Sequence, residues 1–310
     1  MVNEEARGAG TPDPAAPVGP ALPTGELPPG YIWAYQSVAP PRPSWKPPRW
    51  LIVVTVVWAV ALLVSGVIYA RDGKPSVRGQ TTIVGAEPVV NRAVVTVAAA
   101  AGAGPVAAIG GFTKIGDCTI TPVRSGVDYQ RTIMFYAAPG SESAVLKTIA
   151  SGLPRSYAAK SGPGAILDLY ADAGDYVAIT GAVPAPGEIE IRAATGCREA
   201  GGAIAEPPAP AIGSPGMAPV RAVLAALGVV ATSTSQAEIN CPGGTGTMRT
   251  VAAHAPSGQV PGPLGSTLAS LAAAPALASP NVFAYRSGTT DVVATQDSSG
   301  LTVAATTRCQ

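Results

Sequence analysis

An uninterrupted apolar run over residues 50–70, WLIVVTVVWAVALLVSGVIYA, constrains this chain more than any other feature. A helix needs about 20 apolar residues to cross a hydrocarbon core of roughly 30 Å, and this run carries no charge. Trp50 and Tyr69 stand near its two ends, and such amphipathic rings are typical of the lipid headgroup level. A cleaved signal peptide fits poorly, because its apolar region is shorter and lies nearer the start. We therefore expect a retained, single-pass transmembrane helix (a signal-anchor) over 50–70.

The orientation of this helix cannot be assigned from basic residues, because equal numbers flank it. Arg42, Lys46 and Arg49 precede the run, and Arg71, Lys74 and Arg78 follow it. The cysteines are more informative, since all four follow the run and paired cysteines persist in oxidising compartments. We expect a protein of the cell membrane with its N-terminus in the cytoplasm and an extracytoplasmic C-terminal ectodomain.

The segment before the apolar run is rich in proline, and we expect residues 1–49 to form a disordered cytoplasmic tail. Its last part adds four aromatic residues to prolines and basic residues: Tyr31, Trp33, Tyr35 and Trp45. One interpretation is a docking peptide for a cytoplasmic partner. The other, which we favour, is a spacer whose aromatic rings rest on the membrane surface.

The sequence after the run contains an internal repeat. The block from Cys118 to Cys197 and the block from Cys241 to Cys309 share features in the same order. The matching segments are 131–139 with 249–256, 146–154 with 265–275, 175–180 with 291–295, and 188–197 with 300–309. Similar apolar stretches, 87–102 and 218–228, precede the two blocks. The common order indicates a tandem duplication.

The periodicity within one unit predicts its secondary structure. Ser141 is a candidate N-cap of a helix that ends near 152–154. Alternation of apolar and polar residues predicts strands over 167–172, 176–180 and 188–193, and residues 131–137 suit a central strand. Each unit therefore reads as helix, strand, strand, helix and a three-strand meander. This is an α+β fold with helices on one side of a mostly antiparallel sheet.

These patterns divide the chain into six parts: a tail (1–49), the transmembrane helix (50–70), a juxtamembrane spacer (71–85), a first unit (86–198), a Gly-, Pro- and Ala-rich linker (199–216) and a second unit (217–310).

The four cysteines allow three pairings, and the duplication favours pairing within each unit. We expect disulfides Cys118–Cys197 and Cys241–Cys309, each closing one unit. A zinc site is the alternative, but the chain has one histidine and no CxxC spacing.

Candidate catalytic residues are few. The single histidine, His254, aligns with Tyr136 of the first unit, which favours a structural or surface role. The chain has no GxSxG, P-loop, HExxH or GxGxxG motif. Asp168, Asp172 and Asp175 surround one hairpin, where solvated turn residues are a better explanation than a calcium site. We expect no catalytic, metal or cofactor-binding residues.

The net charge of +1 gives no basis for binding nucleic acid. The layout of tail, single span and stapled ectodomain resembles that of many bacterial envelope proteins, in layout only. We expect a non-enzymatic, membrane-anchored envelope protein whose duplicated ectodomain binds a protein or a cell-wall component. The alternative is a transmembrane signalling or assembly adaptor that docks a partner through its proline-rich tail.

Overall fold

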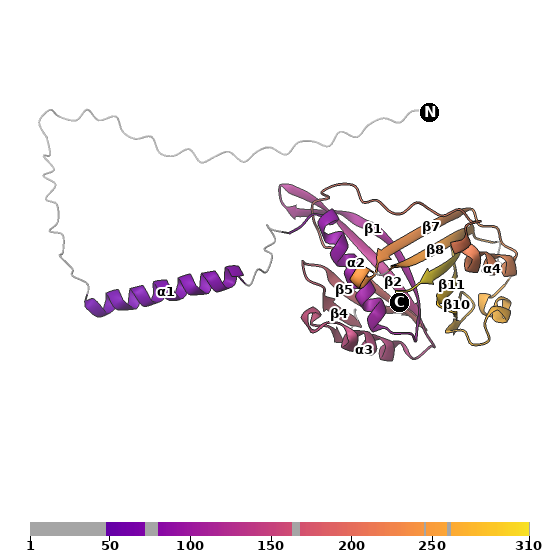
Figure 1. Ribbon diagram of the computed structural model, residues 1–310, viewed down its shortest axis with the longest axis horizontal. Coiled ribbons are helices and arrows are strands. Elements are labelled where there is room, and N and C mark those ends of the chain that lie inside the picture. The colour runs from indigo at the N-terminus through magenta and orange to yellow at the C-terminus, as the bar shows by residue number, and fades with distance from the viewer. Residues whose placement is uncertain (1–47, 72–79, 163–167, 245, 259–261, 310) are drawn as a thin grey trace, which may run out of the picture. The chain divides into compact units, whose positions relative to one another are not determined.

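The computed structural model describes residues 48–71, 80–162, 168–244, 246–258 and 262–309 (Figure 1). The chain divides into one compact part that ends at Arg71 and another that begins at Asp72, which we call the main body. The four aromatic residues of the candidate docking segment, Tyr31, Trp33, Tyr35 and Trp45, lie outside the described residues.

Two described helices are long and apolar enough to cross a membrane by length and composition alone. In α1 (Arg49–Arg71), which covers the apolar run, the candidate span Arg49–Val67 has no buried residue. In α2 (Ile83–Ala100), 44% of the residues are buried against the rest of the main body. The two helices therefore differ in their surroundings, and α2 is a core helix.

The main body begins with α2, followed by an antiparallel sheet of six strands in the order β1-β2-β6-β5-β4-β3. The strands are β1 (Val106–Thr121), β2 (Arg124–Tyr136), β3 (Lys160–Ser161), β4 (Leu169–Asp172), β5 (Ala178–Ala185) and β6 (Glu188–Ala194). Between β2 and β3 lie α3 (Glu142–Gly152) and a short 3₁₀ turn (Arg155–Tyr157).

A second antiparallel sheet of six strands follows, in the order β7-β8-β12-β11-β10-β9. Its strands are β7 (Ser233–Asn240), β8 (Thr247–Pro256), β9 (Leu277–Ala278), β10 (Val282–Ser287), β11 (Thr290–Asp297) and β12 (Gly300–Thr307). Helix α4 (Ala218–Leu227) precedes it, and α5 (Leu264–Thr267) separates β8 from β9. The spatial order of the strands is the same in both sheets, with β1 to β6 corresponding to β7 to β12.

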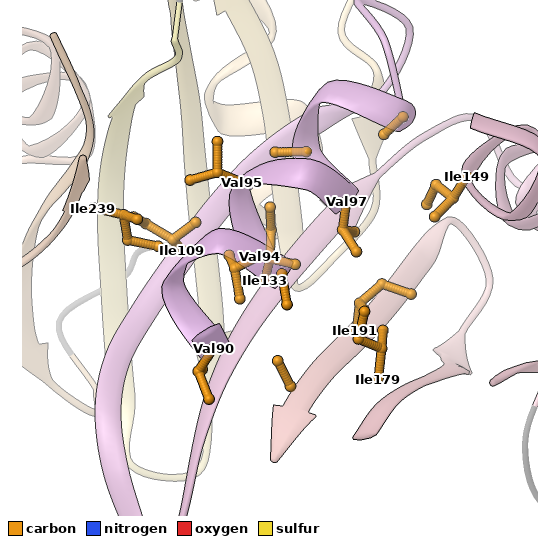
Figure 2. Packing of buried hydrophobic residues seen from close by; sticks show 14 of the residues in the cluster. Val90, Val94, Val95, Val97, Ile109, Ile133, Ile149, Ile179, Ile191 and Ile239 are labelled. Carbon is orange, nitrogen blue, oxygen red and sulfur yellow. The ribbon is translucent and has the colours of Figure 1, made fainter. Parts of the chain in front are cut away.

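The first core lies between the first sheet and the helices α2 and α3. Alternation in β6 produces the buried face, because Ile189, Ile191 and Ala193 are buried while the intervening residues face the other side. Figure 2 shows valines of α2 facing this sheet; the labelled residues include Val90, Val94 and Val97 from α2, Ile133 from β2, Ile149 from α3, and Ile179 and Ile191 from β5 and β6.

The second core lies between α4 and one face of the second sheet. It contains odd-numbered residues of β8, such as Val251 and Ala253, together with Val223 and Leu224 of α4. The even-numbered residues of β8 consequently point to the opposite face of this sheet.

Both predicted disulfides are confirmed. Cys118 is bonded to Cys197 and Cys241 to Cys309, with Cα–Cα distances of 5.9 and 5.7 Å. The first joins β1 to the segment after β6, and the second joins the residue after β7 to the segment after β12. The expectation of an α+β fold with antiparallel sheets is also confirmed.

One local prediction is confirmed in position only, and another was incomplete. Ser141 occupies the N-cap position of α3, but its hydroxyl donates to the carbonyl of Ala138 and caps no helical N–H. The two-residue strands β3 and β9 add a fourth strand to each predicted three-strand meander.

Candidate binding site between the two sheets

The two sheets meet where β1, an edge strand of the first sheet, lies on the open face of the second. The backbone N–H of Ala107 donates to Asp291 Oδ2 (2.8 Å), and that of Ile109 donates to Thr250 Oγ1 (3.0 Å). Side chains of β11 and β8 thus satisfy the unpaired edge of β1. An unpaired edge is otherwise a template for aggregation, so this contact explains how the fold protects β1.

Asp291 is fully buried and holds the two sheets together electrostatically. Its Oδ1 accepts from Arg286 Nε (2.7 Å), and its Oδ2 accepts from Arg308 Nε (2.6 Å). Both arginines also donate to the backbone carbonyl of Pro105, in the segment between α2 and β1. We call Asp291, Arg286 and Arg308 the arginine clasp. It fixes β1 against the second sheet.

The register of the second sheet arranges side chains of its open face in rows that cross the strands. The clasp row, which contacts β1, consists of Asp291, Thr306 and Thr250. The floor row lies two residues further along each strand and consists of Val293, Ala304 and Ala252. The rim row lies two residues beyond that and consists of Thr295, Thr302 and His254.

A groove of about 620 Å³ opens over the floor row and the rim row. Its opposite wall belongs to the first sheet, including Ala108 of β1 and Met134 and Tyr136 of β2. The side chains of Val293 and Tyr136 also pack in a small apolar core that both sheets share. The groove is therefore built by the packing of the two sheets and exists in neither sheet alone.

His254 lies at the centre of the polar side of this groove. Its Nε2 is 3.0 Å from Ser235 Oγ of β7, and its Nδ1 is 3.1 Å from Thr302 Oγ1 of β12. The serine–histidine contact resembles part of a hydrolase triad, but a threonine hydroxyl occupies the place where a triad has a carboxylate. A hydroxyl does not stabilise an imidazolium as a carboxylate does, so the contact lacks the third group that orients the base in a triad.

The segment between the two sheets borders the groove. Glu206 Oε1 accepts from the backbone N–H of Phe112 (2.6 Å), and the carbonyl of Pro210 accepts from Thr234 Oγ1 (2.6 Å). Glu206 also lies 3.5 Å from the guanidinium of Arg131, which is almost completely buried. Burial lowers the pKa of Arg131, while Glu206 opposes that shift.

The groove carries almost no charge. Among the described residues that line it, Glu206 is the only Asp, Glu, Lys or Arg, and its carboxylate is engaged by Phe112 and Arg131. Burial raises the pKa of Tyr136, and the charge of Glu188 adds to the effect, so this phenol stays neutral at physiological pH. Hydroxyl groups supply most of the polar lining.

Two of the three aspartates that the sequence places around one hairpin, Asp172 and Asp175, form hydrogen bonds or ion pairs within the protein. Asp175 pairs with the buried Arg198 (3.2 Å) and accepts from Thr81 Oγ1 (2.6 Å), so its role as a solvated turn residue was wrong. Asp172 does act as a turn residue, accepting from the N–H of Gly174 (2.8 Å). In the described part of the chain, no cluster of three or more His, Cys, Asp or Glu side chains could hold a metal ion.

Sequence reasoning missed the groove, although one signal pointed to it. The repeat alignment made Tyr136 and His254 equivalent, and the structure places both on its lining. What could not be read was that the two residues line the same groove, because that depends on how the sheets pack.

Beyond α1, the fold and site define an α+β protein body of two packed six-stranded antiparallel sheets with a nearly uncharged groove between them. No protein-family model, curated protein or solved structure matches the chain.

Proposed function

We propose that this chain is a single-pass, membrane-anchored envelope protein with an extracytoplasmic ectodomain. The ectodomain is not an enzyme and binds a protein or cell-wall partner in the groove between its two sheets. The groove is the observation that carries the binding role, because a concave site with convergent polar groups is the usual form of a binding site.

The proposed anchor is α1. Its candidate span has no buried side chain, and such a surface would be unstable in water unless lipid covered it. The disulfides support an oxidising compartment for the ectodomain.

Membrane insertion is tested by extracting cell membranes at alkaline pH and probing intact spheroplasts with protease. The wild-type chain should stay in the membrane pellet, and its ectodomain should be digested from outside. The double variant Val57→Arg/Val60→Arg should be released, because each central arginine costs about 2.5–3.5 kcal/mol on insertion scales. Release of the wild-type chain, or full protection of the ectodomain, would contradict the proposal.

The binding role is tested by crosslinking in intact cells and capturing the chain with its partner. Ala304→Phe places a ring on the groove floor and should reduce capture at least tenfold. Ala225→Phe adds the same ring to an exposed position of α4 and should leave capture unchanged. Equal capture by both variants would exclude the groove as the binding site.

A further inference from the structure

We infer that the groove binds an extended, uncharged segment of polypeptide, so that the partner is a protein. This inference rests on the proposed binding role of the groove and specifies the chemistry of its ligand.

The open face of the second sheet already binds one extended strand. The N–H of Ala107 meets Asp291 on β11, and the N–H of Ile109 meets Thr250 on β8, with β12 between them. The strand β1 therefore crosses the strands of the second sheet and is held through its backbone by the clasp row. The groove continues this interface along the same three strands and extends over β7.

The spacing of the rows leaves room for a second extended chain. The clasp row and the rim row are separated by four residues, which is about 13–14 Å along a strand. Neighbouring strands in a sheet lie about 4.8 Å apart. One extended chain therefore fits beside β1 over the small side chains of the floor row.

The length of the groove suits a short segment. It crosses β7, β8, β12 and β11, which are neighbours in the sheet. Three strand spacings amount to about 14 Å, the length of roughly four extended residues.

The polar groups match a peptide backbone. Both ring nitrogens of His254 are engaged by Ser235 and Thr302, one as donor and one as acceptor. The hydroxyl that accepts from the ring can still donate to a C=O, and the hydroxyl that donates to the ring can still accept from an N–H. A charged ligand side chain would be desolvated here without a partner, which is costly. The one aromatic ring on the lining, Tyr136, is only 5% exposed and offers little surface on which a sugar ring could stack.

The single histidine provides a specific probe of the groove. Full-length protein without a histidine tag, reconstituted in lipid nanodiscs and labelled with ¹⁵N-histidine, gives imidazole NMR signals from His254 alone. We would titrate it with a pool of end-capped octapeptides built from glycine, alanine, serine, threonine and valine. The matched probes are the same pool with lysine or glutamate at the two central positions, and chitotetraose.

The expected result is a saturable shift of the His254 signals with the uncharged pool and at least tenfold weaker binding of the charged pools. Ala304→Phe should abolish the shift and Ala225→Phe should preserve it. A shift with chitotetraose and none with peptide would overturn the inference while leaving the proposed function intact. No shift with any probe would also overturn it, and partner capture by the wild-type chain would still test the proposed function separately.

Discussion

Asp175 and Asp291 occupy matching positions in the two repeats read from the sequence, and the structure gives them related contacts. Asp175 binds Arg198, which follows Cys197, and Asp291 binds Arg308, which precedes Cys309. Each aspartate therefore fixes the segment that carries the last cysteine of its repeat. Asp291 has a second role, because it also accepts from the edge of β1.

Replacement of Asp291 by asparagine should strongly destabilise the main body. Asparagine keeps the shape but removes the charge that compensates Arg286 and Arg308. Breaking a buried ion pair by removing one partner costs about 3–5 kcal/mol. Urea unfolding measures the loss. The control is Asp117→Asn, which removes an ion pair with Lys114 from a side chain that is 81% exposed and should cost less than about 1 kcal/mol.

Glu142 predicts a pH dependence of stability. Its carboxylate accepts from the backbone N–H of Gly187 (2.5 Å) and of Gly140 (3.0 Å), and these bonds, Gly187 first, lower its pKa. A lowered folded-state pKa stabilises the fold above the ordinary pKa of about 4.5, and this stabilisation is lost as the pH falls below that value.

The variant Glu142→Ala should therefore lose about 1.5–3 kcal/mol at pH 7, the usual range for hydrogen bonds to a charged group. The difference from wild type should shrink between pH 5 and pH 3, as measured by urea unfolding. Glu190→Gln, which removes a carboxylate from the other face of the first sheet, is the control. A difference that stays constant with pH would show that Glu142 acts only through packing.

These residues show which hydrogen bonds could not be predicted from the sequence. The position of Ser141 before α3 was readable, but the group that satisfies nearby N–H groups is Glu142. Its second donor, Gly187, is 45 residues away and has φ +83°, and a Cβ there would lie 2.7 Å from the carbonyl of Ala137. Contacts across such a distance depend on the folded sheet.

The two apolar helices show why composition alone does not assign an element. Both α1 and α2 pass the length and apolarity test for a membrane span. In α2, however, apolar residues at helical spacing pack on the first sheet, so one of its faces is already covered by protein. The core helix differs from the proposed anchor in that one of its faces is buried. This burial depends on packing against the sheet and cannot be read from composition.

Truncation of the buried face of α2 should destabilise the fold. Val94→Ala removes two buried carbons from a side chain that is 1% exposed, and we expect a loss of about 2–3 kcal/mol. Val84→Ala is the matched control on the same helix, where the side chain is 39% exposed and the cost should be below about 0.5 kcal/mol. Thermal unfolding monitored by circular dichroism measures both. Equal effects would contradict a core position for α2.

The elements themselves were largely predictable, because period-2 and helical patterns reflect local burial. The strands predicted to end near 172 and 193 were read correctly to within a few residues, and the disulfides followed from the repeat. The strand predicted over 176–180 extends to Ala185. The two-residue strands β3 and β9 carry too short a pattern to be seen. The order of strands in each sheet was not readable either, because it is set by long-range pairing.

At the scale of the whole main body, the two sheets share their cores. The first core contains Ala237, Ile239 and Met248, which belong to β7 and β8 of the second sheet. A third apolar cluster combines Val106 and Tyr136 of the first sheet with residues of β9, β10 and β11. The groove depends on this packing, which explains why the sequence, read as two separate units, gave no site.

The shared cores and the arginine clasp predict that both sheets unfold in one cooperative transition. Separating β1 from the second sheet would expose apolar side chains of both sheets, so neither sheet can unfold alone at low cost in free energy. Hydrogen exchange with mass spectrometry, in increasing urea, would follow peptides from β5–β6 and from β11–β12 in the same full-length sample. Their protection should be lost at one urea midpoint, and Asp291→Asn should lower both midpoints together. Two separate midpoints in the wild-type chain, or a shift confined to the second sheet, would show that the sheets are independent and that the groove is not a fixed site.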